Sequence, residues 1–246
     1  MKIQAFFAVR NLRPAVVFWI LEGSEMSHKS RSAKPSYNHI VSTLFFLVFF
    51  ILFITFGLAI TFYGEPFLFW EHALSDLGCT VTRQGNPNVI PRLIFTLGML
   101  AESFVMLSIL AQYSAEELYR NQAPKRVLAL LGAAGFLVSI LPNDRYHVIH
   151  SVGVGSSVAA LYFFSMLYHF ELKEHLSSWQ FYLDVALLQI AVFSYAVSFF
   201  ADWASKQSYQ KICIMGVFYV LLKAVSVTKE SFAPGEIFNQ FPHFRQ

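Results

Sequence analysis

Two histidines and an aspartate lie together in the segment LPNDRYHVIHS, residues 141–151, at the edge of a strongly apolar stretch. If a helix begins near Asp144, then Asp144, His147 and Ser151 share one stripe, with His150 at its edge. An Asp–His pair of this kind is an oriented general base, and a serine beside it is a candidate nucleophile. The spacing D-x-x-H-x-x-H is much less specific than the metalloprotease pattern H-E-x-x-H.

A second polar group follows the first apolar stretch, in the segment HALSDLG, residues 72–78. A helical turn there places His72 and Asp76 on one face, and Ser75 is a further candidate nucleophile. Histidine nitrogen and carboxylate oxygen are donors of catalytic zinc sites, which take three protein ligands and leave a position for water. Zinc is therefore the metal considered. The metal-ligand candidates are His72, Asp76, Asp144, His147 and His150, and the catalytic candidates are Asp144, His147, His150, Asp76 and Ser75.

The same residues also have interpretations without chemistry. Asp144 follows Pro142 and Asn143, and aspartate is a common N-cap of a helix. His147 and His150 then belong to the membrane interface, like the aromatic residues around them. A third interpretation is a pocket that recognises a lipid head group or a solute without catalysis. The sequence leaves these alternatives open.

The composition indicates a membrane protein. Of the 246 residues, 56% are hydrophobic and 13% are charged, whereas about a quarter of the residues of a soluble domain are charged. The net charge of +3 is small and the basic residues form no stripe, which argues against a nucleic-acid partner. Membrane lipid is the expected partner. The two cysteines, Cys79 and Cys213, exclude a cysteine-based zinc framework and leave one disulfide open.

Six apolar segments approach the roughly 20 residues that a transmembrane helix needs. The predicted fold is therefore an all-α, polytopic integral membrane bundle of six transmembrane helices within residues 39–230. In the third segment, Gly132 and Gly135 predict close packing against a neighbouring helix. The predicted spans are Val41–Tyr63, Val89–Ala111, Val127–Leu141, Val148–Phe170, Tyr182–Ala201 and Ile212–Thr228.

The distribution of Lys and Arg predicts the orientation. These residues gather before the first span and in the connections after the second and fourth, and such an excess is typical of cytoplasmic segments. Residues 1–38 are then a cytoplasmic N-terminal extension, with an interfacial helix or disorder as the alternatives for its structure, and residues 231–246 are a cytoplasmic tail. The connections 64–88, 142–147 and 202–211 lie on the outer face, so both polar groups share one side of the membrane.

Two charged residues lie deep within predicted spans. Glu102 in the second span and Lys223 in the sixth lie at matching depths. Charges inside a membrane usually face the bundle interior and are often paired, so an ion pair between Glu102 and Lys223 is predicted. Its functional interpretation is a proton or ion pathway.

The order of several segments resembles a prokaryotic six-span family known as domain of unknown function 998. The segments are HALSDLG, NPNVIPRLIFTLGML, GAAGFLVSILPND and HVIHSVG, within roughly residues 40–230. The family's characteristic points are a Ser–Asp–Leu/Gly element, here residues 75–78, and a Pro-x-Asp element, here residues 142–144, followed by histidine. The family is distantly similar to DRAM-like proteins and to the remodelling proteins of glycosylphosphatidylinositol anchors, which implies a lipid-related role.

The membrane zinc hydrolases of the alkaline ceramidase and adiponectin receptor superfamily are a second comparison. They differ from this chain, which has six predicted spans rather than seven and no histidine pair in the last one. The predicted function is an outer polar pocket that acts on or binds a lipid head group, by metal-assisted or acid–base hydrolysis or transfer. The alternative is a non-enzymatic protein that binds a lipid or a partner, or a small-solute or proton-coupled transporter.

Overall fold

The computed structural model describes residues 36–115, 121–173 and 175–231. In these residues the regular structure is helical, apart from one isolated bridge between Val81 and Pro87. The predicted all-α class is confirmed. Most of the predicted N-terminal extension and all but the first residue of the predicted C-terminal tail lie outside the described residues. The helices are α2 (Ser36–Thr61), the short 3-10 helix η2 (Leu74–Gly78), α3 (Val89–Ala115), α4 (Gln122–Val138), α5 (His147–Glu171), α6 (Ser178–Phe200) and α7 (Lys206–Ser231).

Five of these helices, α2, α3, α5, α6 and α7, are long and apolar enough to cross a membrane, which indicates a multi-pass membrane protein. The third predicted span is the one that differs. Its helix, α4, begins five residues earlier than predicted and has 17 residues, or about 25 Å at 1.5 Å per residue. Pro124 does not prevent the early start, because the N–H groups of the first helical turn have no partner within the helix.

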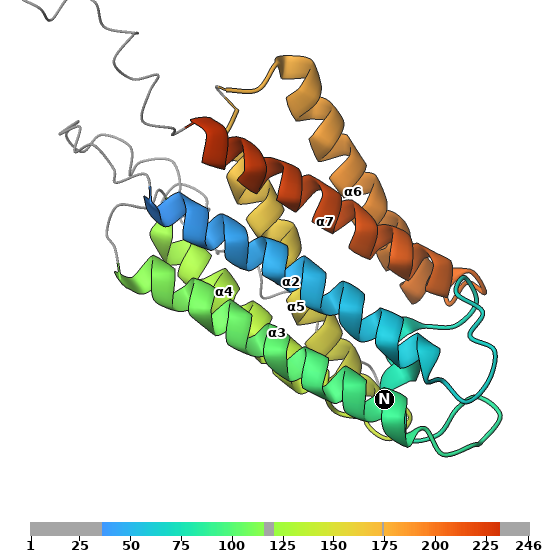
Figure 1. Cartoon of the computed structure of the whole chain (residues 1–246). Coiled ribbons are helices and arrows are strands. Elements are labelled where there is room, and N and C mark those ends of the chain that lie inside the picture. Colours follow the sequence, from blue (N-terminus) through green and yellow to red (C-terminus); the bar gives the residue numbers. More distant parts are fainter. Residues whose placement is uncertain (1–35, 116–120, 174, 232–246) are drawn as a thin grey trace, which may run out of the picture. The chain divides into compact units, whose positions relative to one another are not determined.

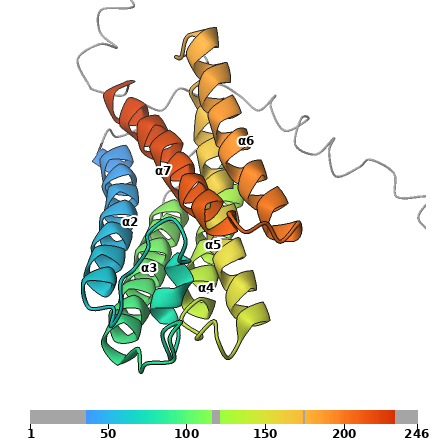
Figure 2. The same ribbon diagram turned by 90° about the vertical axis from the view of Figure 1, so that its right-hand side faces the viewer.

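The long helices run alternately up and down the bundle (Figure 1). The first four pack in chain order, α2 on α3, α3 on α4 and α4 on α5, while α7 packs against α2, α5 and α6. Consequently α2 and α7 begin and end the described chain side by side (Figures 1 and 2). α6 packs chiefly on α7 and takes little part in the centre of the bundle.

Small residues allow α4 and α5 to approach closely. A Cβ atom added at Gly135 would lie 2.5 Å from the backbone nitrogen of Ser157, and one added at Gly153 would lie 2.8 Å from that of Ser139. A Cβ atom at Gly132 would meet the end of the Met106 side chain at 2.5 Å. The prediction of close packing at Gly132 and Gly135 is confirmed.

The connection between α2 and α3 folds back over the bundle and is fastened to the first turns of α7. Ser208 donates a hydrogen bond to the carbonyl of Trp70 at 2.8 Å. The buried ammonium group of Lys211 donates to the carbonyl of His72 at 2.5 Å, and the side-chain oxygen of Gln210 accepts the N–H of Leu74 at 3.1 Å. The end of the bundle that this connection covers is called the loop end below.

Candidate functional site

Asp76 holds the first connection together. Its Oδ2 atom lies 2.9 Å from both Nε and a terminal nitrogen of Arg83 and accepts the N–H of Ala73 at 3.1 Å. η2 begins at Leu74, so His72 precedes the helical turn and does not share a face with Asp76 as predicted. The carboxylate of Asp76 therefore stabilises the fold of this connection, with Arg83 as its counter-ion.

His72 is turned into the bundle. The residue is 7% exposed, and its ring packs edge-on against the rings of Tyr63 and Phe67, with centroids 6.2 and 5.0 Å away. Burial, followed by the nearby positive charge of Arg83, lowers the pKa of His72 below its usual value. The ring is therefore neutral at pH 7. Its buried Nδ1 atom has no hydrogen-bond partner in the described part of the chain.

Asp144 ties two connections to each other. Both of its carboxylate oxygens accept the backbone N–H of Thr80 at 3.1 Å, and Oδ2 also accepts the Thr80 hydroxyl. Burial acts to raise the pKa of Asp144, but the hydrogen bonds from Thr80 outweigh it and leave the pKa below 3.8. α5 begins at His147, with Tyr146 as its N-cap. Asp144 thus lies outside the predicted helical stripe and does not cap α5, because its side chain is used by Thr80.

The two histidines of α5 face different surroundings. His147 is exposed and its Nδ1 atom lies 2.8 Å from the side-chain oxygen of Asn143. His150 is 2% exposed, and its Nδ1 atom donates to the carbonyl of Leu141 at 2.7 Å, since a carbonyl can only accept. Its Nε2 atom is buried without a partner in the described residues.

The predicted site residues therefore do not converge on one point. The described residues contain no group of three or more His, Cys, Asp or Glu side chains placed to hold a metal ion. Asp76 is used by Arg83 and Asp144 by Thr80, so these carboxylates bind the connections together. The donor set does not fit a zinc site, which needs three ligands around one ion.

The predicted ion pair between Glu102 and Lys223 is wrong. The ammonium group of Lys223 lies 2.7 Å from Oδ2 and 2.8 Å from Oδ1 of Asp184. Glu102 is fully buried, and neither carboxylate oxygen has a hydrogen-bond partner among the described residues. The backbone of Leu52 lies near the Glu102 carboxyl without hydrogen-bond geometry. Matching depth did not decide the pairing, because Lys223 on α7 faces α6.

A polar triad of His169, Asp184 and Lys223, the first two buried, joins α5, α6 and α7, and the predictions did not include His169 and Asp184. Asp184 is 2% exposed and accepts from Lys223, and its Oδ2 atom lies 3.3 Å from Nε2 of His169. His169 is 1% exposed, and its Nδ1 atom contacts the carbonyl of Ser165 at 3.1 Å. The sequence signal that could have revealed this triad was Asp184, a lone aspartate early in the fifth apolar segment, because a charged residue inside a span usually pairs with another polar group.

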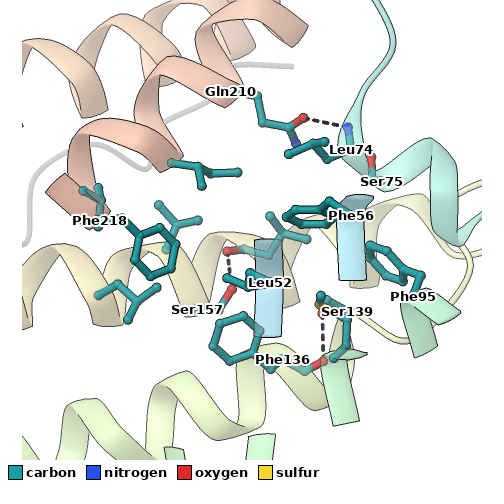
Figure 3. A pocket seen from close by; sticks show the side chains of 16 residues that line it. Leu52, Phe56, Leu74, Ser75, Phe95, Phe136, Ser139, Ser157, Gln210 and Phe218 are labelled. Atoms are coloured by element: carbon teal, nitrogen blue, oxygen red, sulfur yellow. Dashed lines mark hydrogen bonds between the residues drawn. The ribbon is translucent and has the colours of Figure 1, made fainter. Parts of the chain in front are cut away.

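The bundle interior holds an apolar cavity, called the central cavity (Figure 3). The space that atoms leave empty there amounts to about 610 Å³, with the open solvent at its mouth included. α2, α3, α5, α7, η2 and the end of α4 contribute to its wall, but α6 does not. The sixteen lining residues are Leu52, Phe56, Leu74, Ser75, Phe95, Met99, Phe136, Ser139, Val154, Ser157, Val158, Leu161, Gln210, Ile214, Val217 and Phe218.

The polar residues of this wall are few and mostly satisfied within the protein. Ser139 and Ser157 donate to the carbonyls of Phe136 and Val154 at 2.7 and 2.9 Å, as the dashed lines in Figure 3 show. Gln210 accepts from the backbone of the first connection. Ser75 is the one candidate catalytic residue in the wall, and no histidine or carboxylate of the described chain forms a hydrogen bond with its hydroxyl group. The cavity is thus an apolar binding space.

Comparison of this chain with protein-family models, with curated proteins and with solved structures finds no match. The function is therefore inferred from the central cavity and the buried polar groups around it.

Proposed function

We propose that this protein is a six-span membrane protein that binds the apolar part of a lipid, or a similar apolar molecule, in the central cavity. The observation that carries the proposal is an apolar cavity in the bundle whose sixteen lining residues include no charged side chain. Transfer of apolar surface into such a space is favourable, at about 25 cal/mol per Å².

The proposed sixth crossing is α4. Backbone hydrogen bonds continue its turn past Val138, from Ser139, Ile140 and Leu141 to carbonyls three or four residues earlier. Residues 122–141 then cover roughly 30 Å, the thickness of the hydrocarbon core. With six crossings both chain ends lie on one side, which the Lys and Arg distribution assigns to the cytoplasm. The loop end then faces outward.

Binding is favoured over catalysis by the way the polar groups are used. An acid–base mechanism needs a base within hydrogen-bond reach of the nucleophile, and Ser75 has no such partner in the described chain. The carboxylates of Asp76 and Asp144 hold the connections that close the loop end. The proposed role of these residues is therefore to keep the cover of the cavity in place.

Filling the cavity tests the proposal. Val154 lines the central cavity, whereas Val152, two residues earlier on α5, is 62% exposed on the outside of the bundle. Val154→Phe adds a ring inside the cavity, and Val152→Phe adds the same ring outside it. The purified protein in nanodiscs is photolabelled with a diazirine-bearing fatty alcohol, and the labelled peptides are identified by mass spectrometry.

In the parent and in Val152→Phe, labelling at cavity-lining residues is expected, and excess dodecanol should suppress it. Val154→Phe should lose most of this suppressible labelling. Labelling that dodecanol does not suppress, or equal labelling in both variants, would contradict binding in the cavity.

A further inference from the structure

The central cavity ends close to a buried acidic residue. Phe95, Met99 and Glu102 follow one another on α3 at spacings of four and three residues, so they lie on one face of the helix. Phe95 and Met99 line the cavity. Glu102 is the next residue of that face, farther from the loop end, and the backbone of Leu52, another lining residue, lies near its carboxyl. Glu102 thus does not line the cavity itself, but it occupies the next position of the helix face on which Phe95 and Met99 line it.

The carboxyl group of Glu102 has no partner in the described chain. Its exposed fraction is 0%, and both oxygens are buried without a hydrogen bond. Lys223 is held by Asp184, and no residue of the cavity wall carries a positive charge. An isolated ionised carboxylate in a low-dielectric interior is very costly. In the empty protein Glu102 is therefore the neutral acid, and its acceptor oxygens remain unused.

The chemistry that complements such a group is a cation with several hydrogen-bond donors. An ammonium group has three N–H donors and no acceptor, and a charged pair forms stronger hydrogen bonds than a neutral one. We propose that the central cavity binds a molecule with an apolar body and a protonated amine, and that its ammonium group forms an ion pair with Glu102. This proposal rests on the proposed binding of an apolar molecule in the cavity.

Binding of the ammonium group leaves the net charge inside the bundle unchanged, which makes it compatible with the membrane interior. When the ammonium group arrives, the carboxylic acid of Glu102 releases its proton to water and becomes a carboxylate. One positive and one negative charge replace a neutral acid, so the net charge inside the bundle stays zero. Met99 lies between the cavity and Glu102 along α3, and its unbranched side chain changes rotamer easily. A change of the Met99 rotamer is the proposed route by which the ammonium group reaches the carboxyl.

The test compares a neutral and a cationic ligand with the same body. Dodecanol and dodecylamine compete with the photoreactive fatty alcohol for the parent protein and for Glu102→Gln, which keeps the shape of the side chain but cannot ionise. In the parent, dodecylamine is expected to compete at least tenfold better than dodecanol at pH 8. Because one proton is released per amine bound, its affinity should rise about tenfold per pH unit while Glu102 is the acid in the empty protein.

In Glu102→Gln dodecylamine should compete no better than dodecanol at pH 8, because an ammonium group without a counter-charge is costly in an apolar cavity. A pH-indicator dye in weak buffer measures the proton released by the parent. Equal competition in the parent, or an amine preference that survives in Glu102→Gln, would overturn the role of Glu102 while leaving apolar binding intact. Failure of dodecanol itself to compete would instead remove the proposed function.

A second readout does not depend on the variant. Dicyclohexylcarbodiimide is apolar and adds to protonated carboxyl groups in apolar surroundings. Mass spectrometry of the parent should find its adduct on Glu102, and dodecylamine should prevent the reaction. An unmodified Glu102 peptide, or an adduct that dodecylamine leaves unchanged, would contradict a neutral acid reached from the cavity.

Discussion

The contact between α4 and α5 offers a sharp test of the packing, through the variant Gly135→Ala. The new methyl carbon would lie 2.5 Å from the backbone nitrogen of Ser157 and 2.8 Å from the carbonyl oxygen of Gly153. Ordinary contacts begin at 3.4 Å, so the helices must separate by about 0.9 Å at this point. Both obstructing atoms belong to the backbone, and no rotamer change can move them away.

The expected size of the effect follows from this separation. Overpacking of a close contact costs roughly 1–3 kcal/mol, against which alanine gains about 1 kcal/mol over glycine in a helix. Gly155 provides the matched control, because a Cβ atom added there meets nothing within 4 Å. Gly155→Ala should therefore keep the full gain, and the free energies of unfolding of the two variants should differ by roughly 1–3 kcal/mol.

Thermal unfolding of both variants in the same detergent measures the difference. For a chain of this size, 1 kcal/mol corresponds to roughly 2–4 °C, so Gly135→Ala should unfold at least about 2 °C below Gly155→Ala. Gly132→Ala should fall between them, because its close neighbour is the flexible end of Met106. Equal unfolding temperatures of Gly135→Ala and Gly155→Ala would refute the close approach of the two helices.

Three further predictions concern Asp184, the two cysteines and Asp144. Asp184→Ala should lower the free energy of unfolding by roughly 1–3 kcal/mol in chemical denaturation, since it leaves buried His169 and half-buried Lys223 without this partner, and adding Lys223→Met should recover part of the loss. Burial, then the charge of Asp76, raises the pKa of Cys79 to about 11, so only about one thiol in 10⁴ is ionised at pH 7. Maleimide should therefore label Cys79 and Cys213, both buried and free, only after denaturation, and fast labelling of native protein would contradict their burial. The pKa of Asp144 lies below 3.8 in the folded protein, so its stabilising contribution should be complete above about pH 4 and lost as the pH falls further. The unfolding temperature of Asp144→Asn should not show this fall at acid pH. Identical pH profiles of the parent and Asp144→Asn would exclude a stabilising role of the Asp144 carboxylate.

The polar residues that the sequence analysis selected have structural partners at very different distances along the chain. Asp144 binds Thr80, 64 residues earlier, and this contact could not be predicted because hydrogen bonding between two connections depends on how both fold. Asp76 found its counter-ion only seven residues away, in Arg83. Asp76 pairs with Arg83 because the chain turns at η2 and again at Gly85, whose φ is +86°.

The central cavity was not predicted from the sequence at all. Its wall combines residues from separate helices, such as Leu52 of α2, Phe136 of α4 and Phe218 of α7. Each of these residues reads in the sequence as one more apolar position of a span. Empty space between helices depends on the shapes of the side chains that meet there, and hydrophobic periodicity does not predict how these side chains pack.

The sequence by itself determined the helical class, the approximate limits of five membrane-length helices and the close packing at Gly135, because apolar length and small residues act locally. It also placed Glu102 and Lys223 at similar depths, since each helical residue rises a fixed 1.5 Å. Only the tertiary structure decided their partners. The depth of a residue follows from its position in the helix, but the neighbour that its side chain faces depends on the order and rotation of the helices. In the folded protein Lys223 pairs with Asp184, and the carboxyl group of Glu102 has no hydrogen-bond partner among the described residues.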